Sequence, residues 1–241
     1  MGQDKLVVIT RPNDDARDFL EQVTVAGFSG LLAPMLDIIP QTFSVPDLCG
    51  YQGVIFTSAR AVCLFSASTD VRDVPIFVVG SRTEDVAKGC GFLTVHCANG
   101  SGLDLADLIM ETAHCGDDPF LHVRGRHVAV SIDDLISSAG IQVDHLVVYD
   151  AQAIESLDAE VLRVFHEKRV EAVTFFSRRT AQNFMSLVEK NNLGDLLFAT
   201  KVLCISEAVL ECVRSYRWAD AYVSDRPNGP GMLALLKRVC S

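Results

Sequence analysis

Two segments of the sequence place a serine directly after a short apolar run. Gly53–Phe65 contains Ser58 in this position, and Glu171–Phe184 contains Ser177. A serine at the point where a strand becomes a helix can cap that helix by accepting a backbone N–H bond. The helix start also offers unpaired N–H groups and a positive dipole, which suit an anionic ligand. We therefore predict two matching anion-binding corners; the alternative is that each serine is only a cap.

Other predicted strands end in residues of the same kinds. Ligands of open parallel sheets bind beyond the carboxyl ends of the strands, and arginine suits carboxylates because its guanidinium donates two parallel hydrogen bonds. These positions therefore predict a site for a carboxylated ligand. They are Thr10, Arg11, Thr57, Ser58, Arg60, Gly80, Ser81, Arg124, Gly125, Ser177, Arg178 and Ser206, with Arg82, Arg126 and Arg179 close by in the sequence. The alternative is that several of these arginines are solvated surface residues, and we expect roughly half of them to be so.

Tyr149 is the candidate catalytic residue. It ends a predicted strand that leads into a predicted linker, and a tyrosine hydroxyl can act as an acid toward a leaving oxygen. The alternative is a structural tyrosine beside the linker. The sequence contains no P-loop, no G-x-S-x-G and no complete G-x-G-x-x-G, so no standard catalytic motif competes with this interpretation.

Metal and disulfide chemistry are not expected. None of the eight cysteines falls in a C-x-x-C, and the six histidines have no H-E-x-x-H spacing. Most of the cysteines lie in apolar strand or helix patterns, so we expect reduced thiols that pack as small hydrophobic groups. No metal site is predicted.

The elements that position these residues alternate between strand and helix along the whole chain. This alternation predicts an α/β protein whose parallel sheets carry helices on both faces. Asn13 or Asp14 is expected to cap the first helix, and a final helix is expected after Pro230. The expected strands are Leu6–Thr10, Leu31–Met35, Val54–Thr57, Ile76–Val79, Leu93–His96, Phe120–Val123, Gln142–Tyr149, Ala172–Phe176, Val202–Ile205 and Ala221–Val223.

A repeated spacing predicts two domains. Arg11 lies sixteen residues before Gly27, and Arg124 lies sixteen before Gly140. The two segments that carry a serine at a strand end also share a spacing with each other. The chain therefore consists of four successive segments, in which arginine and serine alternate at the strand ends, beginning with arginine. We predict a discontinuous domain of residues 1–36 plus 153–241 and an inserted five-stranded domain of residues 47–145, with hinge linkers at 37–46 and 146–152. Sequential domains divided near residue 118 are the alternative.

Charge and composition limit the partners. The formal net charge of −10 argues against binding to nucleic acid. With 49% hydrophobic residues a sizeable core is available, and no segment has the length of a membrane span or the layout of a signal peptide. We expect a cytoplasmic monomer with a small-molecule substrate, without a nucleic-acid or membrane partner.

Several of these residues, in this order, resemble the uroporphyrinogen-III synthase family. They are Val8-Ile9-Thr10-Arg11-Pro12, Val54–Val62, Val78-Val79-Gly80 with Thr83, Arg124-Gly125, Val147-Val148-Tyr149, Phe175-Phe176-Ser177 and Cys204-Ile205-Ser206. The resemblance implies two flavodoxin-like domains joined by a two-stranded linker. It also implies the dehydrating cyclisation of hydroxymethylbilane, a linear tetrapyrrole octacarboxylate, to uroporphyrinogen III with ring D inverted, without a metal or cofactor.

The resemblance also implies roles for single residues. Tyr149 matches the tyrosine that assists departure of the substrate hydroxyl. The substrate-binding positions that match are Thr57, Ser58, Arg60, Gly80, Thr83 and Ser177. One segment departs from the family: Ser206 and Glu207 stand where a glycine and a threonine are common, so a contact from that side is in doubt. The competing hypothesis is a non-catalytic two-lobed module that binds an anionic small molecule.

Overall fold

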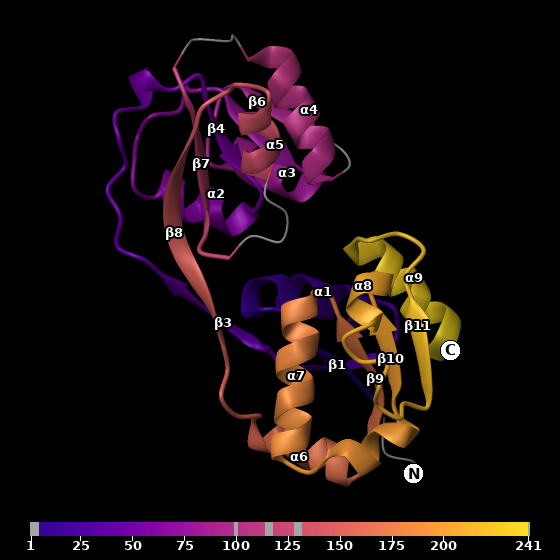
Figure 1. The fold of residues 1–241 in the computed structure, drawn as a ribbon. Helices are drawn as coiled ribbons and strands as arrows, with labels where there is room; N and C mark the ends of the chain where they lie inside the picture. The colour runs from indigo at the N-terminus through magenta and orange to yellow at the C-terminus, as the bar shows by residue number, and fades with distance from the viewer. Residues whose placement is uncertain (1–4, 99–100, 114–117, 128–131, 241) are drawn as a thin grey trace. The chain divides into compact units, whose positions relative to one another are not determined.

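A computed structural model describes residues 5–98, 101–113, 118–127 and 132–240 of the protein. The chain forms two compact units, which are labelled element by element in Figure 1. The outer unit consists of Met1–Asp37 and Gln152–Ser241, and the inserted unit consists of Ile38–Ala151. The chain passes from one unit to the other along β3 and returns along β8.

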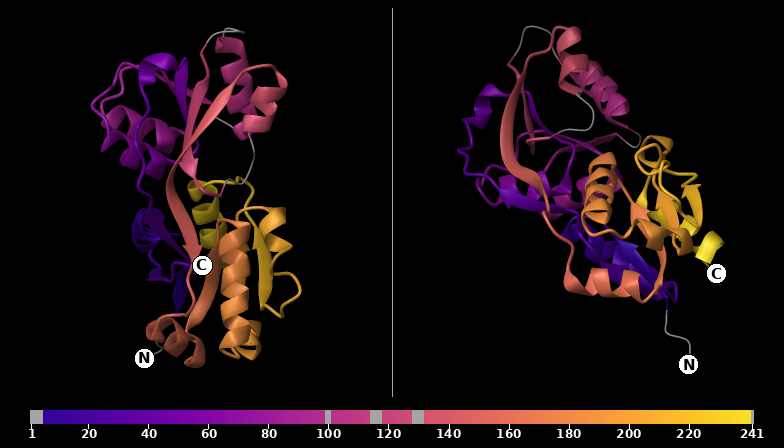
Figure 2. Two further views of the ribbon diagram at one scale, coloured as in Figure 1. Left: turned by 60° about the vertical axis from the view of Figure 1, so that its left-hand side comes forward. Right: turned by 60° about the horizontal axis from the view of Figure 1, so that its bottom comes forward.

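The outer unit is built on a sheet of five parallel strands in the order β11-β10-β9-β1-β2. Helices cover both faces of this sheet, as the further views in Figure 2 show. Side chains of α1 and α9 pack on one face, and side chains of α6, α7 and α8 pack on the other. The elements are β1 Leu6–Ile9, α1 Asn13–Val25, β2 Ser29–Leu32, α6 Ala159–His166, β9 Val170–Phe175, α7 Arg178–Lys190, β10 Lys201–Cys204, α8 Glu207–Leu210, β11 Asp220–Val223 and α9 Gly229–Cys240.

The inserted unit is built on a six-stranded sheet in the order β3-β8-β7-β4-β5-β6. The five strands from β8 to β6 are parallel to one another. Residues of α2 and α3 belong to the core on one face, and residues of α4 and α5 belong to the core on the other. The elements are β3 Leu36–Pro40, β4 Gly53–Phe56, α2 Ala59–Ser66, β5 Ile76–Val79, α3 Ser81–Gly89, β6 Val95–Ala98, α4 Gly102–Thr112, β7 Phe120–Gly125, α5 Ile132–Ser138 and β8 Val143–Ala153.

The apolar runs become central strands because both of their faces are buried. In β4 the side chains of Val54 and Phe56 join the core on one face, while Ile55 joins the core on the other, and all three are fully buried. Alternation along a strand sends successive side chains to opposite faces, so a continuous apolar run fits a sheet that is covered twice. The predicted α/β class with parallel sheets and helices on both faces is confirmed.

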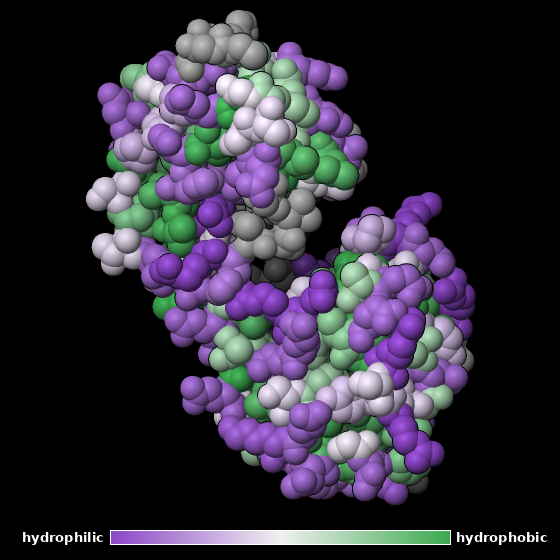
Figure 3. Space-filling model, viewed as in Figure 1, coloured by the Kyte–Doolittle hydropathy of each residue, from purple (hydrophilic) through white to green (hydrophobic). Residues whose placement is uncertain are grey.

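The face of each unit that Figure 3 shows is mainly polar. Figure 3 shows hydrophilic side chains over most of the visible surface of each unit, with smaller hydrophobic areas between them. Within the described part of the chain, no helix has the length and apolar character that crossing a membrane requires.

Several expected elements differ from the structure. Part of the expected 37–46 linker is the strand β3, so the inserted sheet has six strands rather than five. Pro40 ends this strand at the edge of the sheet, where a missing N–H donor is tolerated. The strand expected at Leu31–Met35 lies at Ser29–Leu32, and the strand expected at Leu93–His96 lies at Val95–Ala98.

Two helix starts also differ from expectation. α1 begins at Asn13 with Pro12 at its N-cap, and the side chains of Asn13 and Asp14, one of which was expected to cap this helix, lie outside the described part of the structure. The helix expected from Ser206 has only four α-helical residues, Glu207–Leu210. Both differences are local, and neither changes the order of the strands.

Candidate functional site

Most of the predicted site residues of the inserted unit lie at one edge of its sheet. The strands β8, β7, β4 and β5 are neighbours and parallel, so their carboxyl ends meet at the same edge. Tyr149 lies on β8, and Arg124 and Gly125 form the end of β7. Thr57, Ser58 and Arg60 follow β4, while Gly80, Ser81 and Thr83 follow β5. The structure therefore brings together residues that are far apart in the sequence.

Tyr149 packs directly on Gly125. A Cβ atom placed on Gly125 would lie 2.6 Å from ring atoms of Tyr149 and 3.0 Å from its hydroxyl oxygen. The backbone N–H of Arg126 donates to the carbonyl of Tyr149 at 2.9 Å, at the point where the register of β7 and β8 shifts. Within the described residues the Tyr149 hydroxyl makes no hydrogen bond. The half-buried Tyr149 is therefore held at the strand end, and its hydroxyl has no partner in the part of the chain that the structure describes.

The two helices that begin after β5 and β4, at the same edge as Tyr149, differ at their N-termini. Gly80 has φ of +82°, a left-handed conformation that favours glycine, and its carbonyl accepts from the N–H groups of Thr83 and Glu84 at 3.1 and 3.2 Å. Ser58 occupies the N-cap of α2, but its hydroxyl accepts no capping bond. The alternative interpretation of Ser58, as a side-chain cap only, therefore has no support. Its hydroxyl, unlike a capping one, is left for another partner.

Arg124 is an incompletely paired cation at this edge. Its Nε atom is buried without a hydrogen-bond partner, and its Nη1 donates to the carbonyl of Arg126 at 3.5 Å. Within the described residues it forms no ion pair. A guanidinium in this condition is a strong donor for a carboxylate, because two of its N–H groups can bond in parallel.

The outer unit places its predicted residues at the carboxyl ends of β1, β9 and β10, which are also neighbours. The guanidinium of Arg11 lies 4.3 Å from the ring centroid of Phe176, a cation–π contact that fixes it beside the end of β9. Ser177 caps α7 by accepting from the N–H of Thr180 at 3.2 Å, and Arg178 is exposed in the first turn of this helix. Ser206 stands at the N-cap of α8 without a side-chain capping bond.

Two features of the inserted unit were missed in the sequence. Asp150 follows Tyr149 and lies 3.5 Å from Arg126 Nε and 3.7 Å from His127 Nε2. Its position next to Tyr149 in the chain was a signal that could have identified it. The second feature is a cluster in which the buried Asp133 pairs with the buried His122 and the exposed His145, and no local motif indicates it.

The cysteines fit the expectation of reduced thiols in part. None of the cysteines that the structure describes forms a disulfide bond, but Cys49 and Cys63 are exposed rather than packed. Burial, together with the nearby groups of Cys212 and Glu207, raises the pKa of Cys204 to about 12. Among the residues described there is no group of three or more potential metal ligands.

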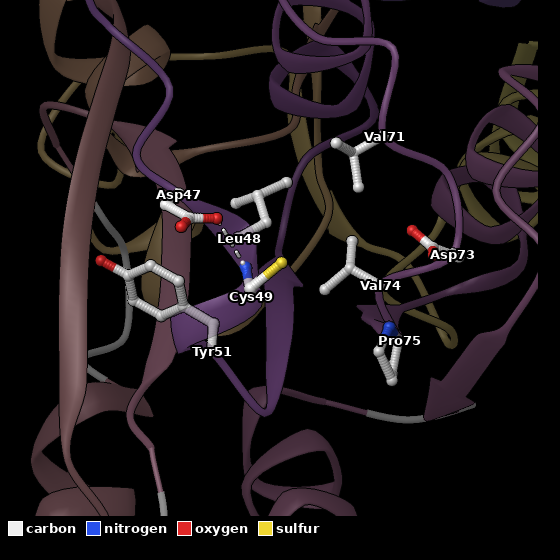
Figure 4. A pocket seen from close by; sticks show the side chains of 8 residues that line it. All are labelled: Asp47, Leu48, Cys49, Tyr51, Val71, Asp73, Val74 and Pro75. Carbon is white, nitrogen blue, oxygen red and sulfur yellow. Dashed lines mark hydrogen bonds between the residues drawn. The ribbon is translucent and has the colours of Figure 1, made fainter.

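A pocket of about 210 Å³ in the inserted unit lies away from the strand ends described above (Figure 4). It is formed by residues that precede β4 and β5, at the amino edge of the sheet. Its walls are largely apolar, and its two carboxylates would repel an anionic ligand. The lining residues are Asp47, Leu48, Cys49, Tyr51, Val71, Asp73, Val74 and Pro75.

Comparisons with known proteins agree with the resemblance seen in the sequence. The family described as uroporphyrinogen-III synthase HemD matches residues 18–234. The uroporphyrinogen-III synthase of Chlorobaculum parvum (strain DSM 263 / NCIMB 8327) is 26% identical over 220 residues, which are 86% of this chain and 89% of that protein.

Two solved structures share the fold. The uroporphyrinogen-III synthetase of Helicobacter pylori 26695 has a TM-score of 0.65 at 15% identity, covering 97% of this chain and 98% of its own. A mutant uroporphyrinogen III synthase of the extremely thermophilic bacterium Thermus thermophilus has a TM-score of 0.53 at 16% identity, covering 98% of each chain. The predicted resemblance is thereby confirmed: the chain belongs to the uroporphyrinogen-III synthase family, whose members are hydro-lyases of tetrapyrrole biosynthesis.

Proposed function

We propose that this chain converts hydroxymethylbilane to uroporphyrinogen III by a dehydrating cyclisation that inverts ring D. The observation that carries the proposal is the gathering of Tyr149, Arg124 and the helix starts after β4 and β5 at one edge of a parallel sheet. The substrate presents many carboxylates, and this edge presents guanidinium groups and helix N–H groups. The charges are complementary even though the chain as a whole is acidic.

The binding roles follow from these groups. Arg11, Arg60, Arg124 and Arg178 hold acetate and propionate arms through their guanidinium groups. The hydroxyl and backbone N–H groups of the helix starts take further arms, at Thr57, Ser58, Gly80, Ser81, Thr83, Gly125, Ser177 and Ser206. We propose the domains as residues 1–36 plus 153–241 and residues 47–145, with hinge linkers at 37–46 and 146–152.

Tyr149 is the proposed acid. Its hydroxyl donates a proton to the leaving hydroxyl of the substrate, the C–O bond breaks, and water departs. The pyrrole system is left cationic, and a new C–C bond forms between it and the substituted carbon of ring D. Holding the electrophile against this carbon lowers the barrier by proximity and by placement of charge. The older bond from the substituted carbon to the methylene bridge of ring C then breaks, and this bridge bonds to the free α-carbon of ring D, so that the ring is inverted. The free α-carbon loses its proton to the Tyr149 phenolate, which completes the balance.

The test is the isomer formed from freshly generated hydroxymethylbilane. The enzyme should yield the III isomer well above the amount formed without protein, where the uninverted I isomer arises spontaneously. Heat-denatured protein is the control. A product containing only the I isomer would overturn the proposal and favour a non-catalytic module that binds an anionic small molecule.

Tyr149→Phe tests the acid assignment separately. It should lower kcat on the order of 10²-fold, the range of a lost general acid, with little change in KM. Unchanged turnover would remove Tyr149 from the chemistry while leaving the fold and the binding residues intact. Arg124→Ala and Arg60→Ala should raise KM instead, because they remove carboxylate partners.

We also propose that the protein acts as a cytoplasmic monomer without a nucleic-acid or membrane partner. Its net charge of −10 works against binding to nucleic acid. Light scattering during size-exclusion chromatography measures the mass, and a value near the 26.3 kDa of one chain is expected. A mass of twice this value would overturn the monomer.

A further inference from the structure

The cluster of Asp133 with two histidines lies on the same face of β7 as Arg124. Side chains alternate along a strand, so Phe120, His122 and Arg124 share one face of β7 up to the register shift that follows Arg124. Phe120 packs in the core that contains Ile132 of α5. The next residue of α5, Asp133, therefore reaches this face in the first turn of its helix.

Both carboxylate oxygens of Asp133 are occupied. Oδ1 lies 2.7 Å from His122 Nδ1, and Oδ2 lies 3.0 Å from His145 Nε2. His122 and His145 are register partners on the neighbouring strands β7 and β8, which is why one carboxylate can reach both. His122 is 1% exposed, and its other ring nitrogen, Nε2, is buried without a partner. A buried polar atom without a partner lowers the stability of the protein, so packing alone does not explain why the cluster is present.

The charge of this cluster acts on Arg124. Burial alone would raise the pKa of the Asp133 carboxyl. The hydrogen bond from His122 and the electrostatic fields of both imidazoles and of Arg124 outweigh it, and the pKa lies below its ordinary value. Asp133 is therefore a carboxylate at neutral pH, and the imidazoles donate to it. Its negative charge offsets the cost of the partly buried guanidinium.

A direct ion pair between Arg124 and Asp133 would defeat the binding role of Arg124. Carboxylate and guanidinium prefer a bidentate pair, which takes both carboxylate oxygens and two N–H groups. Here each oxygen already accepts from a histidine, so a bidentate pair would have to share both oxygens with these donors. Within the described residues Arg124 keeps only its long bond to the carbonyl of Arg126.

We propose that Asp133 is a positioning residue for Arg124: its charge stabilises the guanidinium, while His122 and His145 hold its oxygens and prevent the ion pair. The inference rests on the proposed function, in which Arg124 binds a substrate carboxylate. It assigns to the two histidines and to Asp133 an effect on substrate affinity, although none of them contacts the substrate.

The test is a double-mutant cycle on His145 and Asp133. His145→Leu removes the donor to Oδ2, so the freed oxygen turns to Arg124 and KM for hydroxymethylbilane should rise about tenfold, with a smaller change in kcat. In an Asp133→Asn background the same replacement should leave KM unchanged, because an amide carries no charge to pair with Arg124. His145→Gln keeps an N–H donor and should leave KM close to that of the wild type.

A purely structural role predicts a different pattern. His145→Leu would then raise KM equally in both backgrounds, or not at all, and either result overturns the inference. His145 is 42% exposed at its side chain, so its replacement is compatible with folding, and Tm is measured for each variant. His166→Leu, at an exposed position of α6, is the matched control and should change neither KM nor Tm.

If the proposed function itself were wrong, the experiment would give a third result. The wild-type protein would then form no III isomer above the spontaneous level, and no variant would need to be compared. An active wild type with an additive cycle, in contrast, removes the role of Asp133 and leaves the proposed function standing.

Discussion

At the scale of single residues, Gly125 is important because it has no Cβ atom. The ring of Tyr149 occupies the place where any other residue would carry its Cβ, at a separation of 2.6 Å. Gly125→Ala should therefore displace the ring and lower kcat about tenfold or more, because small misplacements of a catalytic group are costly. Steady-state kinetics of III-isomer formation provide the measurement.

A matched glycine separates this effect from a general loss of stability. Gly50 lies in the same unit, and a Cβ there would meet nothing within 4 Å. Gly50→Ala should leave kcat unchanged. If Gly125→Ala were as active as Gly50→Ala, the packing of Tyr149 on β7 would have no bearing on the reaction.

Burial and local charge predict an order of reactivity among the thiols. Cys63 is exposed and should be modified first by a thiol reagent at pH 8. The Asp47 carboxylate beside Cys49 raises the pKa of that thiol, so Cys49 should follow more slowly. Cys204, with its pKa raised to about 12 by burial, should react only when the protein is unfolded.

Peptide mapping by mass spectrometry, with and without urea, follows each cysteine separately. Modification of Cys204 in the folded protein at a rate similar to that of Cys63 would contradict its burial in the core of the outer unit. The sequence alone predicted that most cysteines pack in the interior. It could not single out Cys49 and Cys63, because exposure depends on which side of an amphipathic segment meets solvent.

At the scale of elements, Ser58 and Ser177 show how much of the local structure a sequence repeat predicts. Both follow an apolar strand and precede a helix, so the sequence predicted the same corner twice, and both do stand at an N-cap. Only Ser177 accepts a capping bond, from the N–H of Thr180, whose hydroxyl also bonds to Ser177. The corresponding position after Ser58 is Ala61, which has no hydroxyl to take part.

Replacement of each serine by alanine tests this difference in stability. Ser177→Ala should lower the free energy of unfolding by about 1 kcal/mol, as expected for a lost cap. Ser58→Ala should change it by only a few tenths of a kcal/mol, because no capping bond is lost. Urea denaturation followed by circular dichroism gives both values, and equal losses would show that the two corners are built alike.

The elements that sequence reasoning missed are those that depend on long-range pairing. The continuous apolar runs were sufficient to predict the central strands, because a run without polar residues indicates a strand that is buried on both faces. The segment Leu36–Pro40 has an irregular pattern and a proline, and it becomes a strand only because β8 pairs with it. The contact of His122, Asp133 and His145 likewise exists only after β7, α5 and β8 are assembled.

At the scale of the whole molecule, each unit has a core of its own. Two hydrophobic clusters lie entirely in the inserted unit, and two lie entirely in the outer unit. A segment with its own core and closely spaced ends is expected to fold independently. The inserted unit meets the second condition, because its chain enters along β3 and leaves along β8, and Gln41 N–H donates to the Val148 carbonyl at 3.0 Å.

Residues 38–151, expressed alone, should therefore fold and unfold in one cooperative transition. The shorter segment 47–145, which the sequence predicted as the domain, is the informative comparison. It lacks β3, and it ends before Tyr149 packs on Gly125, so it leaves the edge of β7 and β8 exposed. Thermal unfolding by circular dichroism should give a lower Tm for 47–145 than for 38–151. Equal Tm values would mean that β3 and the end of β8 add nothing to the inserted unit, and that the edge carrying Tyr149 is not part of its stable core.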